Sequence, residues 1–335
     1  MQLMVDTFGA FVGKHSERIF IRTKSDERTE VPLMDLEHVL IIANGVTLSS
    51  DAVRSCVERG IPISFISHGG DLYATVISPE LVGTVRTRRE QLLAYSDDRG
   101  VELARAFALG KLQNQANLLR YMAKYRKTQD HDVYELVRQA ADEILQLAEK
   151  LKGLKAQNVD EIRGPLMNRE AQAAKLYWQA LGELITADVE WPGRQGRGAE
   201  DVVNSCLNYG YGILYSQVQQ AVILAGLDPY AGFTHADRSG KYSLVLDLVE
   251  EFRQPVVDRS VLALLNKGYV PKIEEGRLDE AGRRTLAKRV LERLEAEETH
   301  EGKKRKLKAV VQRQAQKVAA HVRGEGKYKP YVMAW

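Results

Sequence analysis

Four side chains from three separate segments of the sequence have the types and spacing of a divalent-metal site. Glu170 lies in a run of good helix formers, and His235 ends a turn that contains glycine and proline. Asp247 and Glu250 are three residues apart, a spacing that points both carboxylates to one side of a helix. Carboxylate oxygens together with one imidazole favour Mn²⁺ or Mg²⁺ over a closed zinc site. Such a site, open on one side, is suited to chemistry on phosphate esters.

Each of these residues also has an ordinary structural interpretation. A glutamate on an amphipathic helix most often faces solvent, and a lone histidine in a loop is more often a hydrogen-bonded surface residue than a ligand. Asp247 and Glu250 flank the apolar Leu248 and Val249, so they could mark the solvated face of a core helix. Composition and spacing alone therefore leave both interpretations open.

Motifs for other kinds of chemistry are missing from the sequence. Ser239-Gly240-Lys241 lacks the upstream glycine of a phosphate-binding loop, and the chain contains neither a Gly-x-Gly-x-x-Gly nor a His-Glu-x-x-His pattern. No arrangement of serine or cysteine with histidine indicates a covalent protein nucleophile. A phosphate-ester reaction would therefore take its nucleophile from the substrate or from water.

The composition fits a soluble globular protein of two unequal domains, with 335 residues, 44% hydrophobic and 28% charged. The net charge is only +3, so affinity for nucleic acid must come from local clusters of charge. Cys56 and Cys206 form no CxxC pair, which argues against a disulfide framework or structural zinc and favours the reducing cytoplasm. Asp6 interrupts the first apolar run, and we expect neither a signal peptide nor a membrane span.

The elements that must position the candidate residues change in character after Ser78-Pro79. Before this point, short segments rich in β-branched or aromatic residues predict strands at 2–5, 10–13, 18–22, 31–33, 38–42, 61–66 and 72–77. One helix is expected over 51–59, capped by Ser49 or Ser50 and ended by Gly60. The first part of the chain is therefore predicted to be β-rich with a single helix.

Helical periodicity dominates from Thr87 onward. It predicts helices over 103–125, 133–151, 166–185, 199–225, 243–252, 256–265, 280–298 and 308–322. Breaks are expected at Gly164-Pro165 and Pro192-Gly193, and Pro255 is expected to open the helix over 256–265. The predicted fold class is α+β, with a small β-rich domain (1–80), a linker that leads into the helices (81–98) and a larger all-α catalytic domain (99–335).

Three basic clusters are candidates for contact with DNA phosphates. They are Arg86, Arg88 and Arg89 after the strand-rich part, Arg194 and Arg197 in a glycine-containing loop, and Lys303, Lys304 and Arg305 in a carboxy-terminal run. Tyr328, Tyr331 and Trp335 follow the last cluster, and such rings suit stacking on unpaired bases. For each cluster, a solvated surface, an ordinary loop or a flexible tail is the alternative.

Several segments resemble the CRISPR-associated spacer integrases, the Cas-one family. The most specific are 227–235, which ends in Gly-Phe-Thr-His, and 243–253, which contains Asp-Leu-Val-Glu-Glu-Phe-Arg. Weaker likenesses are Val257-Asp258-Arg259 and the segments 82–91, 173–178 and 204–211, so the resemblance covers nearly the whole chain in order. One departure is that Asn168 and Ala171 stand where the family commonly carries glycines around its glutamate.

The resemblance implies an enzyme of CRISPR adaptation and antiviral defence, a metal-dependent DNA integrase and endonuclease. It would insert spacer DNA into a CRISPR array by attack of a 3′-hydroxyl on a phosphodiester. The resemblance implies Glu170, His235 and Glu250 as ligands of one Mn²⁺ or Mg²⁺, with Asp247 orienting His235 or a water, or acting as a further ligand. The implied partners are prespacer DNA, the CRISPR repeat, a second copy bound through the amino-terminal domain, and a small adaptation subunit.

Two other functions are compatible with the sequence. One is a structure-specific DNA nuclease that acts outside CRISPR, since its chemistry is the same and only the nucleophile differs. The other is a catalytically silent DNA-binding scaffold, which would keep the basic surfaces and need no metal ligands. The presence of all four candidate ligands argues against the scaffold.

Overall fold

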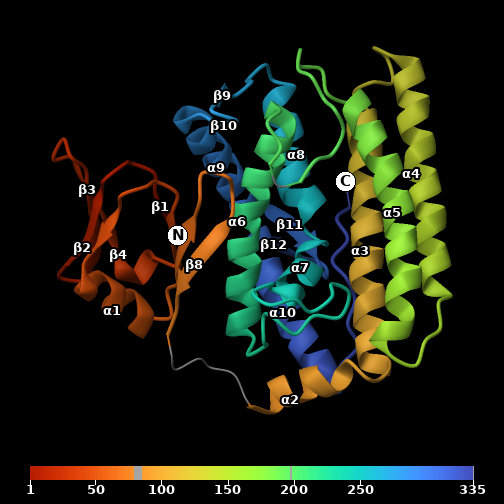
Figure 1. The fold of residues 1–335 in the computed structure, drawn as a ribbon, viewed down its shortest axis with the longest axis horizontal. Helices are drawn as coiled ribbons and strands as arrows, with labels where there is room; N and C mark the ends of the chain where they lie inside the picture. Colours follow the sequence, from red (N-terminus) through yellow and green to blue (C-terminus); the bar gives the residue numbers. More distant parts are fainter. Residues whose placement is uncertain (79–84, 197, 335) are drawn as a thin grey trace.

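The computed structural model describes residues 1–78, 85–196 and 198–334, and it shows a strand-rich part followed by a helical part (Figure 1). The predicted α+β fold class is therefore confirmed. Two small hairpins add to the predicted helices in the second part. In Figure 1 the helix α6 (Val202–Leu224) stands between the strands and the outer helices.

The strand-rich part contains two four-stranded sheets. The first has the order β1 (Gln2–Val5), β5 (His38–Ile41), β7 (Ile63–Ile66) and β8 (Leu72–Val76), and the second has the order β4 (Arg28–Pro32), β3 (Arg18–Arg22), β2 (Phe11–His15) and β6 (Thr47–Leu48). A single turn of 3-10 helix spans Leu33–Asp35. The helix α1 (Ser50–Glu58) begins where Ser49, one of the two predicted caps, accepts a hydrogen bond from the backbone of Ala52. Alternating apolar residues of both sheets form one core with α1.

The helical part is built from nine α-helices among the described residues. Besides α6 they are α2 (Val85–Ala94), α3 (Asp98–Ala123), α4 (His131–Lys152), α5 (Val159–Glu183), α7 (Ser243–Val249), α8 (Arg259–Leu265), α9 (Glu280–Glu295) and α10 (Leu307–Val322). The hairpins are β9 (Ile273–Glu274) with β10 (Arg277–Leu278), and β11 (Glu297–His300) with β12 (Lys303–Lys306). No helix in the described ranges combines the length and apolar character that crossing a bilayer requires.

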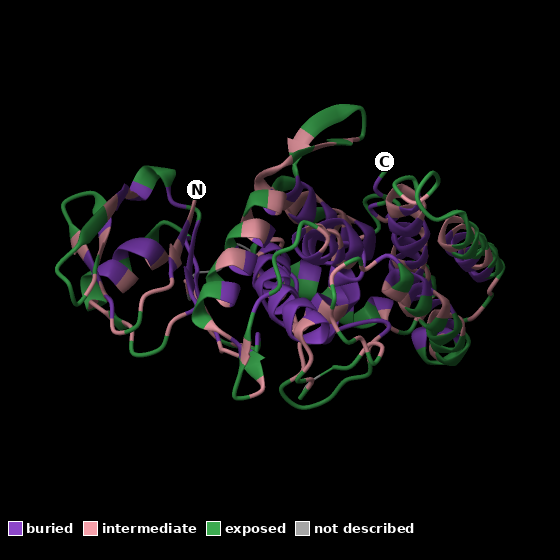
Figure 2. Cartoon of the chain, turned by 90° about the horizontal axis from the view of Figure 1, so that it is seen from above, coloured by how far each residue is buried: buried purple, intermediate pink, exposed green. Residues whose placement is uncertain are grey.

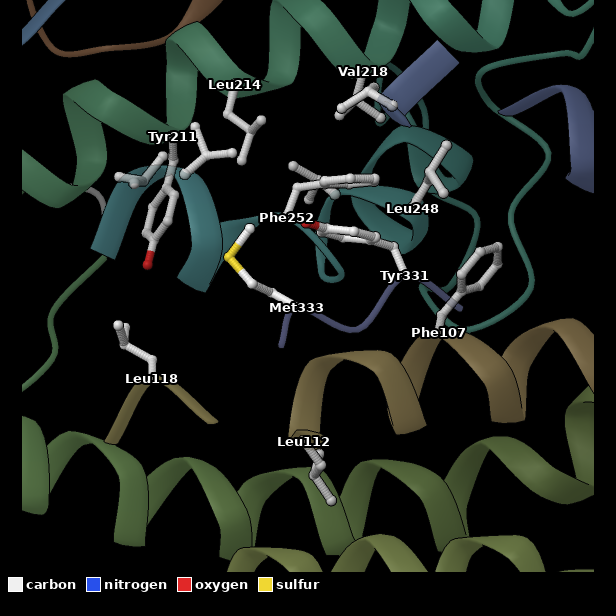
Figure 3. Close-up of a cluster of buried hydrophobic side chains, with 14 of the residues drawn as sticks. Phe107, Leu112, Leu118, Tyr211, Leu214, Val218, Leu248, Phe252, Tyr331 and Met333 are labelled. Carbon is white, nitrogen blue, oxygen red and sulfur yellow. The ribbon is translucent and has the colours of Figure 1, made fainter. Parts of the chain in front are cut away.

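The large core of the helical part lies where α3, α6, α7 and α10 meet. Figure 2 shows buried residues gathered along the centre of this part, with exposed residues on its outer surfaces. In the close-up of this core, the ring of Tyr331 lies beside that of Phe252 (Figure 3), and the two rings stack with centroids 5.2 Å apart. Tyr331 and Met333, near the end of the chain, therefore belong to the core.

The predicted break at Gly164-Pro165 is wrong, because α5 runs from Val159 through Pro165 without interruption. Proline removes one backbone donor from a helix, and this usually disfavours helical structure. Here Ile162 and Leu166 are buried on either side of it, and Asn158 caps the helix by accepting a hydrogen bond from the backbone of Glu161. Burial on one helix face and a strong cap outweigh the lost bond.

Two further helix boundaries differ from the prediction. Pro255 does not open a new helix but lies inside a π-helical turn, Arg253–Asp258, that leads directly into α8. This wider turn keeps the residues from Gln254 to Asp258 buried. The helix predicted over 280–298 ends at Glu295, because Glu301 and Gly302 adopt positive φ angles of 52° and 73° and form the turn of the β11–β12 hairpin.

A buried polar network joins the first sheet to α6. His38 is 1% exposed, and its Nε2 lies 2.9 Å from the Ser64 hydroxyl while its Nδ1 contacts the amide of Gln217. The Gln217 carbonyl in turn accepts a hydrogen bond of 2.7 Å from Gln2. Because each partner comes from a different element, the network fixes how the strand-rich part sits against α6.

The burial of His38 predicts a pH dependence of stability. Burial lowers the pKa of His38 from its usual 6.5 to about 4. Above pH 6.5 the ring is neutral in both the folded and the unfolded chain, so it has no effect on stability there. Between pH 6.5 and 4 only the unfolded chain takes up the proton, so stability falls as the pH drops. Below pH 4 both states are protonated and this loss grows no further.

We therefore expect the stability of the wild type, relative to a His38→Gln variant, to fall by about 2 kcal/mol between pH 7 and pH 5. The variant serves as a reference because glutamine keeps a polar group but does not titrate. Urea denaturation of both proteins across this range measures the difference. A difference that stays constant with pH would show that His38 is not held neutral in the folded protein.

Candidate metal centre

The fold brings Glu170, His235, Asp247 and Glu250 into one region of the helical part. Glu170 lies on α5, and His235 lies on the loop between α6 and α7. Asp247 is on α7, and Glu250 follows the last residue of that helix. Asp247 contacts His235 directly, and Glu170 and Glu250 meet at a common lysine. Three segments that are far apart in the sequence therefore converge.

Asp247 is fully buried and anchors the loop that carries His235. One carboxylate oxygen accepts backbone hydrogen bonds from Phe233 and Thr234, at 2.5 and 3.0 Å. The other accepts the backbone N–H of His235 at 2.9 Å and lies 2.7 Å from the Nδ1 of the same residue. Gly232 is required beside this anchor, since a Cβ there would lie 2.9 Å from the Asp247 carboxylate and closer still to Ser243. Both oxygens of Asp247 are thus engaged within the protein.

The contact with Asp247 determines which nitrogen of His235 is available to a ligand. A carboxylate beside Nδ1 stabilises the tautomer that carries its proton on that atom. Nε2 then presents its lone pair, and the side chain is 30% exposed. His235 therefore offers a partly accessible nitrogen to a ligand, and Asp247 holds its ring in place on the Nδ1 side.

Glu170 and Glu250 share one cation, the ammonium of Lys111 on α3. The Lys111 Nζ lies 3.3 Å from Oε1 of Glu170 and 3.2 Å from Oε2 of Glu250. Burial alone would raise the pKa of Glu250, but Arg253 and Lys111 lower it below its usual value, with a further contribution from His235. Glu250 is thus a buried carboxylate that stays ionised.

Arg253 connects the carboxylates to a buried tyrosine cluster. Its guanidinium lies 3.2 Å from Glu250, donates a hydrogen bond of 2.6 Å to Tyr215, and stacks 4.8 Å above the ring of Tyr211. The hydroxyl of Tyr211 donates to the buried Asp258, which also accepts a hydrogen bond of 2.6 Å from Tyr177. Arg253 is therefore held from two sides and has little freedom to leave Glu250.

The donors at this site suit a hard divalent cation. Oε2 of Glu250 is buried, and its contact is the Lys111 ammonium at 3.2 Å, so a lone pair of this oxygen remains for a metal ion. Two carboxylates and one imidazole nitrogen match the ligand types of Mn²⁺ and Mg²⁺. Among the described residues, no three histidine, cysteine or carboxylate side chains gather closely enough to hold an ion as they stand. The Lys111 ammonium lies between the two carboxylates instead.

A basic cavity of about 880 Å³ lies beside the tyrosine cluster. It is formed by the β7–β8 turn, α6, the loop before α7, and β10. Its cationic lining consists of Arg194, Arg238, Lys241 and Arg277, and the rings of His68, Tyr211, Tyr215 and Tyr242 also line it. Of these cations the sequence pointed only to Arg194. The sequence also contained Ser239-Gly240-Lys241 from this cavity, but it was set aside as an incomplete phosphate-binding loop. Lys111, at the carboxylates, lies within a long helix and belongs to no local motif.

The predicted basic clusters lie in different environments. Arg86, Arg88 and Arg89 are exposed on α2, where Arg86 pairs with Glu325 at 3.8 Å. Arg194 is half-buried and donates to the side chains of Asn204 and Asn208, so it also holds its own loop against α6. Arg197 lies outside the described residues.

The carboxy-terminal run is neither a flexible tail nor an arm with free aromatic rings. Lys303 and Lys304 are exposed on β12, whereas Arg305 on the same strand is half-buried. Tyr328 and Tyr331 are 8% and 2% exposed, so the prediction that they stack on bases is wrong. Their rings pack in the core because Glu251 accepts hydrogen bonds from the Tyr328 hydroxyl and the Tyr331 backbone, both at 2.7 Å. Trp335 lies outside the described residues.

Comparisons with known proteins place the chain beside CRISPR-associated proteins. A family model described as CRISPR associated protein Cas1 matches residues 3–292. A protein of Archaeoglobus fulgidus named CRISPR-associated endonuclease Cas1 1 is 39% identical over 347 residues, which cover 100% of both chains. One of the same name from Francisella tularensis subsp. novicida is 32% identical over 337 residues, covering 99% of each. A solved casposase bound to integration product has a similar fold, with a TM-score of 0.82 at 22% identity, covering 98% of this chain and 92% of that one.

The anchoring of the His235 loop predicts the cost of removing Asp247. Alanine at this position leaves the buried N–H groups of Phe233 and Thr234 without an acceptor, so we expect a loss of about 3 kcal/mol in the free energy of unfolding. A matched control is Asp142→Ala, which removes a half-exposed carboxylate paired with Arg120 and should cost less than about 1 kcal/mol. Denaturant unfolding at pH 7 compares them, and equal losses would contradict the anchoring role.

Proposed function

The chain belongs to the Cas1 family of CRISPR-associated proteins, and from this premise we propose that it is a metal-dependent DNA integrase and endonuclease of CRISPR adaptation. In this transesterification the 3′-hydroxyl of a prespacer would attack a phosphodiester of the CRISPR repeat, and the 3′-oxygen of the adjoining repeat nucleotide would leave as a free hydroxyl. The protein would also hydrolyse DNA when water replaces the attacking hydroxyl. The observation that carries the proposal is the convergence of Glu170 and Glu250 on the Lys111 ammonium, with His235 close enough to Glu250 to help lower the pKa of that carboxylate.

In this proposal Glu170, Glu250 and Nε2 of His235 hold one Mn²⁺ or Mg²⁺. When bound, such an ion polarises a phosphoryl oxygen and lowers the pKa of an attacking hydroxyl. Asp247 supports the ligand His235, because its contact with Nδ1 keeps the imidazole ring oriented. Arg253 keeps Glu250 in place through its own contacts with Tyr215 and Tyr211.

The basic cavity supplies the surface on which a DNA strand would lie. Arg238, Lys241 and Arg277 line it, and none of the three forms an ion pair with a described residue, so their charge is available to phosphates. Tyr242 and Tyr215 offer rings to bases of an unpaired strand. Because the attacking group is the end of a DNA strand, the chemistry needs no protein nucleophile.

The domain assignments follow from the same proposal. Residues 1–80 serve as the surface for a second copy of the chain, residues 81–98 lead into the helices, and residues 99–335 carry the metal centre. Prespacer DNA, repeat DNA and a small adaptation subunit are the proposed partners. Arg86, Arg88, Arg89, Lys303 and Lys304 are exposed and remain candidates for phosphate contact outside the cavity.

The proposal predicts that alanine at Glu170, His235 or Glu250 lowers metal-dependent strand joining and cleavage by more than about 100-fold. Removing a group that only orients a ligand typically costs about 10–100-fold, so removing a ligand should cost more. Asp247→Asn should accordingly keep residual activity, whereas Glu250→Gln should not. The assay uses a labelled prespacer and a repeat-containing plasmid with Mn²⁺, and Glu149→Ala on the exposed face of α4 serves as a control.

DNA affinity and thermal stability, measured in parallel, show whether the variants remain folded and competent to bind. Full activity in EDTA, or in any of the three alanine variants, would contradict the metal centre. Cleavage of branched DNA without any strand joining to a repeat would favour the nuclease that acts outside CRISPR. Binding without either reaction would favour the silent scaffold.

A further inference from the structure

Lys111 is the one side chain of the site that neither the sequence motifs nor the metal chemistry explain. Its side chain is 17% exposed, and it reaches from α3 to the point where α5 and the end of α7 approach each other. Its ammonium makes ion pairs with both Glu170 and Glu250. Among the described residues, Glu170 has no other ion pair or hydrogen bond, so Lys111 is the partner that compensates its charge there.

The positive charge of Lys111 offsets the repulsion between the carboxylates of Glu170 and Glu250. Without a cation between them, two ionised carboxylates at this depth would repel each other and lose the solvation of water. Burial alone would lower the pKa of Lys111, but Glu170 and Glu250 raise it above its usual value. The Lys111 ammonium therefore offsets negative charge at the point where Glu170 and Glu250 meet.

The position of Lys111 is fixed by the packing of α3. Asn114, one helical turn further on, donates hydrogen bonds to the backbone carbonyls of Glu251 and Tyr331, at 2.8 and 2.9 Å. Gly110 lies so close to Glu251 and Pro330 that a Cβ there would be 2.9 Å from a side-chain carbon of each. These contacts hold the backbone of α3 against the turn that carries Glu250, while the lysine stem stays flexible.

We propose that Lys111 is a tethered placeholder for the divalent ion, holding Glu170 and Glu250 together in the unloaded protein and leaving them when the ion binds. This inference rests on the proposed metal centre. One monovalent ammonium cannot share two carboxylates with a divalent ion without strong repulsion, so binding the ion requires the lysine to move away. Lys111 therefore competes with the ion, and its presence weakens ion binding.

The proposal predicts that Lys111→Met binds Mn²⁺ more tightly than the wild type, by about 10-fold, within the range typical of coupling between two sites. Isothermal titration of Mn²⁺ into the DNA-free protein measures this directly. Lys308→Met is the matched control, because Lys308 is also 17% exposed and also pairs with two glutamates, Glu37 and Glu295, away from this site. The control should bind Mn²⁺ like the wild type.

Thermal unfolding gives a second readout on the same proteins. Without metal, Lys111→Met should melt below the wild type, because its two carboxylates repel, and saturating Mn²⁺ should restore more stability to it than to the wild type. If the variant is folded and binds Mn²⁺ no more tightly than the wild type, Lys111 is not a competitor and the proposal fails. Absence of Mn²⁺ binding in both proteins would instead refute the metal centre on which the proposal rests.

The wild type alone provides a test if Lys111→Met does not fold. Reductive methylation followed by mass spectrometry measures how readily each lysine amine reacts. We expect Lys111 to be protected in metal-free protein and to react at least several-fold faster at saturating Mn²⁺, whereas Lys308 should react equally in both. Equal reactivity of Lys111 with and without Mn²⁺ would overturn the proposal.

Discussion

The carboxylate of Asp247 is the interaction on which the geometry of the site depends. It is fully buried, and it accepts three backbone hydrogen bonds from Phe233, Thr234 and His235 as well as the contact with the imidazole of His235. A buried charge is tolerated only when it is compensated in this way. The same contacts that make the burial possible fold the loop, fix the tautomer of the histidine and hold its ring in the region where it helps lower the pKa of Glu250.

The neighbouring buried charges are also compensated by hydrogen bonds and ion pairs, and this explains why Tyr328 and Tyr331 lie in the core. Glu250 is paired with Lys111 and Arg253. The adjacent Glu251 points the other way, and burial raises its pKa to about 7 while hydrogen bonds from Tyr331, Tyr328 and Gln314 act against the rise. The segment from Tyr328 to Met333 therefore closes the space between α3 and the turn that follows α7. Residues far from the motifs support the site.

Much of the fold could be predicted because its signals are local. The strand at Arg18–Arg22 follows from its β-branched and aromatic residues, and the start of α1 follows from the capping serines Ser49 and Ser50. The continuity of α5 through Pro165 could not, since it depends on burial against other helices. The four candidate ligands could be named from motifs, but Lys111 and the cavity arginines Arg238 and Arg277 could not. These residues join the site or the cavity only when distant elements pack together, and a single sequence does not show which elements do so.

A crystal structure of the protein with Mn²⁺, measured at the manganese absorption edge, tests the central claim most directly. The anomalous signal locates the ion independently of the protein atoms. The account predicts one manganese peak bound by Glu170, Glu250 and Nε2 of His235 at about 2.0–2.2 Å. Asp247 should still contact Nδ1, and the Lys111 ammonium should have left the two carboxylates. A peak bound to Asp247 or to Nδ1 of His235, or Lys111 unmoved with no peak beside it at saturating Mn²⁺, would contradict the account.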